Sequence, residues 1–261
     1  MKYLLTGGGT GGHVYPALAI ADEIRQRQED AEFLYVGRKD KLESWVVPEH
    51  GYPIRFVRSR AFPRTSSPSA LLSFAITLWF GIVQSTWILL RYRPEIIIGT
   101  GGYVSAPILF AYGMLSKVGL SRARVFLYEP NAHPGLPNQV VGRLAQRIGV
   151  AFEQAGRWFD MKRVAVVGYP VRRSFLDLEQ ESSREKLGVP QGQKVVLAFG
   201  GSGGARVINE AVIAALPAWR DAGNLTILHV TGRYSGPDYD AIADTQAALA
   251  EIGMNDEEGW Y

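Results

Sequence analysis

The sequence predicts an α/β protein made of two Rossmann-like, doubly wound domains, with the second domain incomplete in this chain. Short apolar runs alternate with longer stretches of helical periodicity, and this alternation is typical of parallel sheets covered by helices on both faces. The pattern that opens such a domain also occurs twice in the chain. An apolar strand, a glycine-rich loop and a helix follow one another from residue 2 and again from residue 194.

Nine apolar runs are expected to form strands. The first series comprises residues 3–6, 33–36, 54–57, 96–100, 125–128, 148–151 and 164–167, and the second comprises residues 195–199 and 225–230. A helix is expected at residues 16–28, where Pro16 suits a first turn and apolar side chains recur at helical spacing. A doubly wound sheet usually has more strands than the second series offers, so we expect a truncated second domain. The junction is expected near Gly168, between domains at residues 1–168 and 169–261.

The composition excludes several classes of protein. The chain has 261 residues, 47% of them hydrophobic, which is enough apolar material for one large core or two smaller ones. Its net charge of +3 does not by itself indicate a nucleic-acid partner. The absence of cysteine excludes disulfides and thiolate chemistry. The apolar stretch at the N-terminus is too short for a signal peptide, so a cytosolic location is expected.

Three glycine-rich loops follow predicted strands, at residues 7–12, 99–103 and 200–204. Glycine allows a ligand to approach the backbone closely, and the helix that follows each loop presents free N–H groups with a partial positive charge. Three such loops at strand ends predict a site for phosphate or diphosphate groups, although glycines can also serve tight turns alone. None of the loops contains the Gly-Lys-Ser/Thr of a P-loop. The second strand ends in Gly37-Arg38-Lys39 and lacks the acidic residue of a nicotinamide site.

His13 directly follows the first glycine loop and is a candidate general base or phosphate ligand. A capping or surface histidine is the alternative interpretation. The four histidines are scattered along the chain and lack the close spacing of a zinc site, so no metal site is expected.

Five motifs, in the same order, resemble those of the glycosyltransferase family 28 enzymes that convert lipid I to lipid II in peptidoglycan synthesis. They are GGGTGGHVYP at residues 7–16, GGYVSAP at 101–107, YEPN at 128–131, GYPVR at 168–172 and GGSGGAR at 200–206. The resemblance extends from residue 1 to about residue 232. It implies a GT-B fold, with a lipid I acceptor and membrane-associating domain at residues 1–168. A partial UDP-sugar-binding domain would follow at residues 169–261.

The resemblance also implies an inverting transfer of N-acetylglucosamine from UDP-N-acetylglucosamine to the C4 hydroxyl of lipid I, without a metal or cofactor. His13 is the expected general base. The residues implied to contact UDP-N-acetylglucosamine are Thr10, Gly11, Gly12, Asn131, Arg172 and Ser202. Those implied to hold the acceptor pyrophosphate are Gly8, Gly9, Gly101, Gly102 and Tyr103. Because part of the family's donor domain is absent here, we expect weak donor binding and little or no turnover from this chain.

Residues 70–90 form an uncharged apolar stretch almost long enough to span a bilayer. A transmembrane helix, a buried crossover helix and an interfacial helix are the three interpretations, and we favour the last. Trp79, Phe80 and Trp87 suit the headgroup boundary. Flanking arginines would attract anionic lipids of the inner leaflet; they are Arg55, Arg58, Arg60, Arg64, Arg91 and Arg93. The expected location is therefore peripheral, at the cytoplasmic face of the membrane.

Two other functions remain open from the sequence. One is a related GT-B transferase acting on another lipid, because fold alone does not fix the acceptor. The other is a non-catalytic, membrane-docked module that binds the acceptor.

Overall fold

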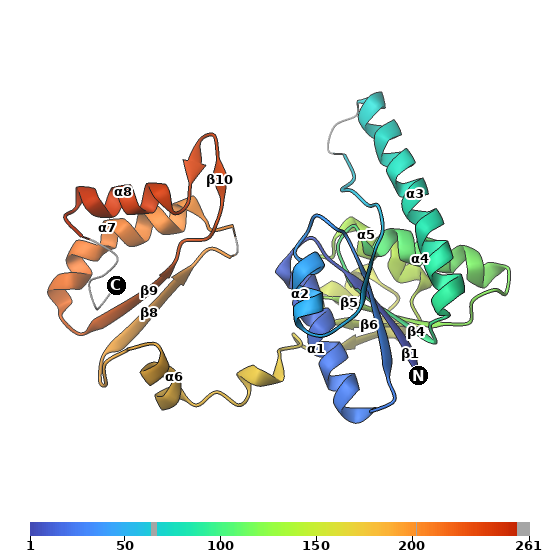
Figure 1. Ribbon diagram of the computed structural model, residues 1–261, viewed down its shortest axis with the longest axis horizontal. Helices are drawn as coiled ribbons and strands as arrows, with labels where there is room; N and C mark the ends of the chain where they lie inside the picture. The colour runs from blue at the N-terminus through green and yellow to red at the C-terminus, as the bar shows by residue number, and fades with distance from the viewer. Residues whose placement is uncertain (64–66, 202, 255–261) are drawn as a thin grey trace. The chain divides into compact units, whose positions relative to one another are not determined.

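The computed structural model describes residues 1–63, 67–201 and 203–254, and Figure 1 shows its helices and strands. The chain forms two compact units, Met1–Leu176 and Asp177–Tyr261. The sequence analysis expects the junction near Gly168, whereas residues 169–176 belong to the N-terminal unit of the structure. The N-terminal unit contains two hydrophobic cores and the C-terminal unit contains one.

The N-terminal unit contains a seven-stranded sheet with the order β3-β2-β1-β4-β5-β6-β7. Every neighbouring pair is parallel. The strands are β1 (Lys2–Gly7), β2 (Glu32–Gly37), β3 (Ile54–Phe56), β4 (Ile96–Gly101), β5 (Arg124–Glu129), β6 (Arg147–Val150) and β7 (Val164–Val166). The strand order reverses at β1 and β4, and in open parallel sheets this is the place where ligands bind.

Helices cover both faces of this sheet (Figure 1). They are α1 (Gly11–Arg27), α2 (Glu43–Glu49), α3 (Pro68–Tyr92), α4 (Ser105–Lys117) and α5 (Leu136–Val141), with short 3-10 turns at Gly142–Leu144, Glu153–Trp158, Met161–Arg163 and Arg173–Phe175. Successive side chains of a strand point to opposite faces. Accordingly, Leu4 of β1 packs in a core with α4, whereas Tyr3 and Leu5 pack in a second core with α1.

All seven predicted strands of the first series are confirmed, but the expected start of the first helix was wrong. Helix α1 begins at Gly11, so Gly11 and Gly12 of the first loop adopt helical geometry, and the Thr10 carbonyl accepts hydrogen bonds from the N–H groups of His13 and Val14. Pro16 consequently lies inside the helix rather than at its start. Because proline has no N–H, the carbonyl of Gly12 loses its usual intrahelical donor.

The C-terminal unit contains β8 (Lys194–Phe199) and β9 (Leu225–Val230), which pair in parallel as the sequence predicts. Its other elements are α6 (Gln180–Lys186), α7 (Arg206–Ala222), α8 (Ala243–Glu251) and the short hairpin β10 (Ser235–Gly236) and β11 (Tyr239–Asp240). Val196 and Ala198 of β8 pack against the core, but Leu197 and Phe199 on its other face are exposed. One face of this two-stranded sheet therefore lacks a covering layer among the residues that the structure describes.

Helix α3 connects β3 to β4 and packs against α4 through a narrow strip of its surface. Gly81, Ser85, Ile88 and Leu89 are its buried residues. A side chain at position 81 would overlap the carbonyl oxygen of Arg58 and would lie 3.1 Å from Pro107 of α4. The absence of a side chain there lets α3 approach the body of the unit closely.

We predict that Gly81→Val destabilises the N-terminal unit by about 1–3 kcal/mol, because the new methyl groups overpack this contact. The matched control is Ala75→Val on the exposed side of the same helix, which introduces the same side chain into open space. Urea denaturation of the two variants measures the difference. Equal stabilities would show that α3 does not pack through Gly81.

Candidate active site

The first two glycine loops meet at the carboxyl ends of β1 and β4. The N–H of Gly8 donates to the carbonyl oxygen of Gly101 at 3.2 Å. Gly102 has a φ of 81°, and a Cβ there would overlap the carbonyl oxygen of Gly8. The hydroxyl of Tyr35 donates to the Gly7 oxygen at 2.6 Å. Only glycine at position 102 permits this approach, so the two loops form one rigid surface.

Two hydrogen bonds with Thr100 fix the position of His13 beside this surface. Its Nδ1 lies 2.8 Å from the carbonyl oxygen of Thr100, and the hydroxyl of Thr100 donates back to the His13 carbonyl at 2.6 Å. Because a carbonyl can only accept, Nδ1 carries the proton of this bond. In the neutral ring, Nε2 is therefore the basic nitrogen. This tautomer suits a general base.

Glu43 determines which amides of the first loop can meet a ligand. Its fully buried carboxyl group accepts from the N–H of Gly9 and from the N–H of Arg38, both at 3.0 Å. Gly8 is itself buried, and its N–H is paired with Gly101. The predicted contribution of Gly8 and Gly9 to diphosphate binding therefore cannot come from these N–H groups without rearrangement.

The remaining amides of the two loops are better placed for an anion. The N–H groups of Gly11 and Gly12 lie in the first turn of α1, where no intrahelical acceptor exists. Among the described residues, no acceptor is bonded to the N–H of Gly102 or of Tyr103. Thr10 and Gly12 are exposed, and Tyr103 is 44% exposed. Unpaired amides at the start of a helix are of the kind that bind anions in proteins.

A second buried carboxyl group, that of Glu129 at the end of β5, holds two asparagine residues in place. It accepts from the backbone N–H and the side-chain amide of Asn131, both at 2.9 Å, and from Nδ2 of Asn138 at 2.8 Å. A Cβ on Gly101 would lie 2.9 Å from both Asn138 Nδ2 and His13 Nδ1. Asn138 of the Glu129 network and His13 therefore border the same small space beside the Cα of Gly101.

Arg172 brings a positive charge to the start of α1. Its guanidinium group stacks 5.0 Å from the ring centre of Tyr15 and 4.8 Å from that of Phe175. The Tyr15 ring in turn lies 3.2 Å from the position that a Cβ of Gly11 would occupy. Of the predicted donor ligands in this unit, Thr10, Gly11, Gly12 and Arg172 are thus grouped at one helix terminus, while Asn131 lies at the Glu129 network.

The third glycine loop belongs to the C-terminal unit, and Ser202 lies outside the described residues. Gly204 has a φ of 79°, and a Cβ there would overlap the Thr231 carbonyl oxygen. Asn209 of α7 donates to that oxygen at 2.9 Å and to the Tyr239 hydroxyl at 2.7 Å. His229 lies 3.0 Å from Asn209 Oδ1, and burial lowers the pKa of His229. This loop is therefore supported by a polar network that the sequence did not reveal.

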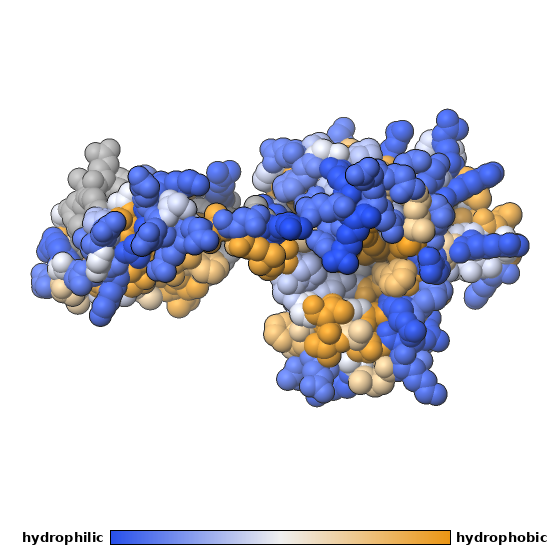
Figure 2. Space-filling view, turned by 90° about the horizontal axis from the view of Figure 1, so that it is seen from below, coloured by the Kyte–Doolittle hydropathy of each residue, from blue (hydrophilic) through white to orange (hydrophobic). Residues whose placement is uncertain are grey.

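Helix α3 presents a long apolar stripe to the outside. Leu72 is 62% exposed, Trp79 61% and Trp87 59%. The other large exposed side chains of the stripe are Leu71, Ile76, Phe80, Val83 and Leu90. Within the described residues, α3 is the one helix that is long and apolar enough to cross a membrane, and only 17% of its most apolar window is buried. Figure 2 shows hydrophobic side chains, in orange, at the surface of this unit beside hydrophilic ones.

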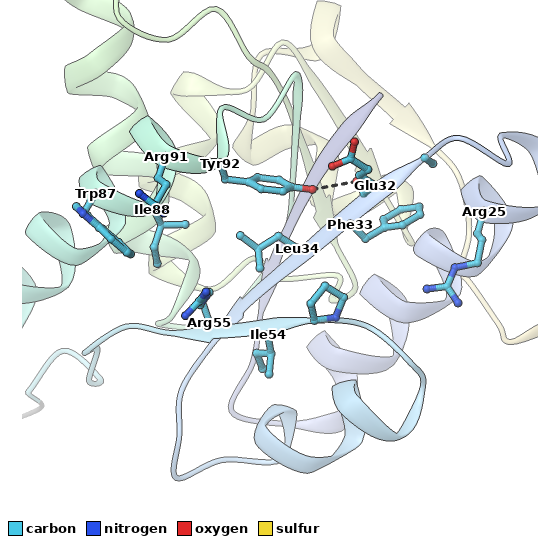
Figure 3. Close-up of a pocket in the computed structure, with 12 residues that line it drawn as sticks. Arg25, Glu32, Phe33, Leu34, Ile54, Arg55, Trp87, Ile88, Arg91 and Tyr92 are labelled. Carbon is cyan, nitrogen blue, oxygen red and sulfur yellow. Dashed lines mark hydrogen bonds between the residues drawn. The ribbon is translucent and has the colours of Figure 1, made fainter.

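Arginines line a pocket beside the C-terminal turns of this helix (Figure 3). Arg55 of β3, Arg91 and Trp87 of α3 and Arg25 of α1 contribute to its walls. The Tyr92 hydroxyl donates to the Glu32 carbonyl oxygen at 3.0 Å and joins α3 to β2. Burial, followed by the negative charge of Glu32, raises the pKa of Tyr92 to about 12, so this donor stays protonated at neutral pH. Arg64 of the predicted basic collar lies outside the described residues.

Residues 3–150 match the family model of the glycosyltransferase family 28 N-terminal domain. The chain belongs to glycosyltransferase family 28. The resemblance drawn from the five motifs is thereby confirmed. This family 28 chain is 39% identical over 233 residues to a UDP-N-acetylglucosamine--N-acetylmuramyl-(pentapeptide) pyrophosphoryl-undecaprenol N-acetylglucosamine transferase of Desulforudis audaxviator. That match covers 89% of this chain and 61% of the relative.

A relative of the same name from Salinibacter ruber is 35% identical over 257 residues, covering 98% of this chain and 67% of the relative. This family 28 chain therefore spans between 61% and 67% of the length of these two relatives. Among solved structures, Acinetobacter baumannii MurG superposes with a TM-score of 0.63 at 23% identity, covering 97% of this chain and 66% of that one. A UDP-GlcNAc 2-epimerase from Neisseria meningitidis gives 0.59 at 12% identity, covering 96% and 70%. These structures confirm the predicted α/β, GT-B-type fold.

We predict that Glu43→Gln destabilises the N-terminal unit by about 1–3 kcal/mol, because the new amide NH₂ must face one of two backbone N–H donors that cannot rotate away. The control is Glu49→Gln, an exposed position on the same helix, which is expected to leave stability unchanged. The free energy of unfolding in urea measures both. Equal values for the two variants would mean that Glu43 does not hold the first loop.

Proposed function

We propose that this chain binds lipid I at the carboxyl edge of its N-terminal sheet and forms part of a transferase that makes lipid II. The enzyme would move N-acetylglucosamine from UDP-N-acetylglucosamine to the C4 hydroxyl of the N-acetylmuramic acid. The observation that carries the proposal is the basic Nε2 of His13, set beside two rigid loops with open amides. The relatives' names specify this donor sugar and this lipid-linked acceptor.

The chemistry follows from the position of His13. Its Nε2 accepts the proton of the acceptor C4 hydroxyl as that oxygen attacks the anomeric carbon of the donor. The new bond forms on the face opposite the diphosphate, so the configuration inverts and UDP leaves with the bonding electron pair. Arg172, together with the amides of Gly11 and Gly12, offsets negative charge near the reacting groups. Preorganised electrostatic stabilisation of this kind often contributes more to catalysis than any other single effect.

Individual residues are proposed to contact either the sugar nucleotide or the acceptor. Thr10, Gly11, Gly12, Asn131 and Arg172 are proposed to contact the sugar nucleotide, with Ser202 of the third loop. The acceptor diphosphate is proposed to rest on the open amides of Gly102 and Tyr103, which lie beside His13. Gly8, Gly9 and Gly101 shape this surface through their contacts with each other and with Glu43. Residues 1–168 thus act as the acceptor domain, and residues 169–261 contribute to the donor domain.

Helix α3 is proposed to lie on the cytoplasmic face of the bacterial membrane. Its stripe, which includes Trp79, Phe80 and Trp87, would enter the headgroup region, while Arg55 and Arg91 meet anionic inner-leaflet lipids. One face of α3 is packed against the unit through Gly81 and Ser85, which favours an interfacial position over a spanning one.

We predict that His13→Gln abolishes most sugar transfer, because glutamine keeps a polar side chain but has no basic nitrogen. The assay measures transfer of labelled N-acetylglucosamine to a lipid I analogue. It uses this chain and a chimera that continues it with the C-terminal third of the Salinibacter ruber relative. General base catalysis of this kind contributes about 10²–10⁴-fold. His50→Gln, at a half-buried position on another loop, is the matched control.

The assay separates the candidate functions. The proposal is supported if the chimera transfers sugar to lipid I and if His13→Gln, but not His50→Gln, lowers that transfer. Transfer to a different lipid, such as diacylglycerol, with none to lipid I would replace it with a related lipid glycosyltransferase. Tight lipid I binding by a folded chimera that transfers no sugar would leave only an acceptor-binding module.

We predict that the double variant Trp79→Gln and Trp87→Gln loses most sedimentation with phosphatidylglycerol vesicles, since two exposed indole rings no longer enter the interface. Trp45→Gln, an exposed tryptophan on α2, is the control and keeps its binding. The pair Arg55→Gln and Arg91→Gln lowers affinity for anionic vesicles, each arginine being worth about 1 kcal/mol. Unchanged binding of the tryptophan variant would remove α3 from the membrane contact.

A further inference from the structure

An apolar cavity of about 420 Å³ lies beside the second glycine loop, between α3, α4 and α5. Its walls include Phe62, Phe74, Leu78, Phe110, Leu136 and Val140. The Phe62 and Phe74 rings meet edge to face, with centroids 5.2 Å apart. The volume falls within the range of small-molecule sites, about 300–1,000 Å³, and the lining is of the apolar and aromatic kind that such sites have.

The cavity adjoins the candidate active site through a shared residue and a shared helix. Tyr103 supplies one of the open loop amides and is also a lining residue of the cavity. Helix α5 forms a shared wall. Its Asn138 is bonded to Glu129 near His13, whereas its Leu136 and Val140 face the cavity. A molecule that places a diphosphate on the second loop therefore has apolar space directly next to that diphosphate.

The polar and charged residues that line the cavity also suit a molecule with an apolar chain and an anionic end. Among the described lining residues, Arg60 is the one charged side chain, and no acidic group is present. Ser59, which is 6% exposed, also lines the cavity, and its hydroxyl has no protein partner within the described part of the chain. A hydrocarbon with a strongly anionic end fits this pattern, since its chain meets apolar walls while its head meets loop amides and a guanidinium group.

We propose that this cavity binds the diphosphate-proximal isoprene units of the polyprenyl carrier on the acceptor. The inference rests on the proposed function and adds a second element of acceptor recognition, in which the enzyme reads the lipid as well as the sugar. The cavity is also distinct from the outward stripe of α3, because Trp79 and Trp87 do not line it.

The test compares the binding of inorganic diphosphate and of farnesyl diphosphate, a short prenyl diphosphate, to the full chain without detergent. Isothermal titration is expected to give a dissociation constant for farnesyl diphosphate lower by about tenfold or more, because apolar surface is buried. Ala106→Phe and Val140→Phe fill the cavity from different walls and are expected to remove this advantage. Both should bind inorganic diphosphate as the unaltered chain does, which verifies folding. Met114→Phe, exposed on the same helix as Ala106, is the matched control.

The outcomes separate this inference from the proposed function. Equal affinity for both probes in the unaltered chain would overturn the prenyl site and leave the diphosphate loops standing. Failure of both probes to bind would overturn the proposed function, and the inference with it. An unchanged farnesyl advantage in both cavity-filling variants would also overturn the inference. Displacement of farnesyl diphosphate by equimolar dihexanoyl phosphatidylglycerol would assign the cavity to an ordinary phospholipid instead.

Discussion

The close contact between the ends of β1 and β4 is the constraint on which the rest of the site depends. Parallel neighbours end at the same edge of a sheet, so the loops that follow them are adjacent by topology. The hydrogen bond from Gly8 to Gly101 and the bond between His13 and Thr100 convert this adjacency into a fixed geometry. The first turn of α1 and the loop before α4 then present their amides together, with the basic nitrogen of His13 beside them.

Two buried carboxyl groups decide which parts of this surface face outward. Burying an acidic group is costly unless it is well hydrogen bonded, and Glu43 accepts two N–H donors while Glu129 accepts three. Burial first, and the negative charge of Glu43 second, raise the pKa of Tyr35, whose hydroxyl donates to Gly7. Glu43 accepts from the amide of Gly9, so the amides that stay open to a ligand are those of Gly11, Gly12 and the second loop. The buried acids thus position the loops without themselves facing a ligand.

The sequence predicted the strands well because a strand of a parallel sheet is buried on both faces and appears as an uninterrupted apolar run, as Ile96, Ile97 and Ile98 show. It failed where distant residues determine a local structure. His13, in the first turn of α1, is bonded twice to Thr100, which lies 87 positions away in the sequence. Glu43 stands among charged neighbours such as Lys41 and looks like a surface residue, yet a backbone amide 34 positions away in sequence holds it in the core. Asn138 lies in no recognised motif, and only the fold brings it to Glu129.

The most direct test of this account is a nitrogen-15 NMR titration of the chain with inorganic diphosphate. The account predicts that the amide resonances of Gly11, Gly12, Gly102 and Tyr103 shift progressively, while those of Gly8 and Gly9, which are bonded within the protein, move little. Large shifts at Gly8 and Gly9, or no shift at any of these six amides, would contradict it.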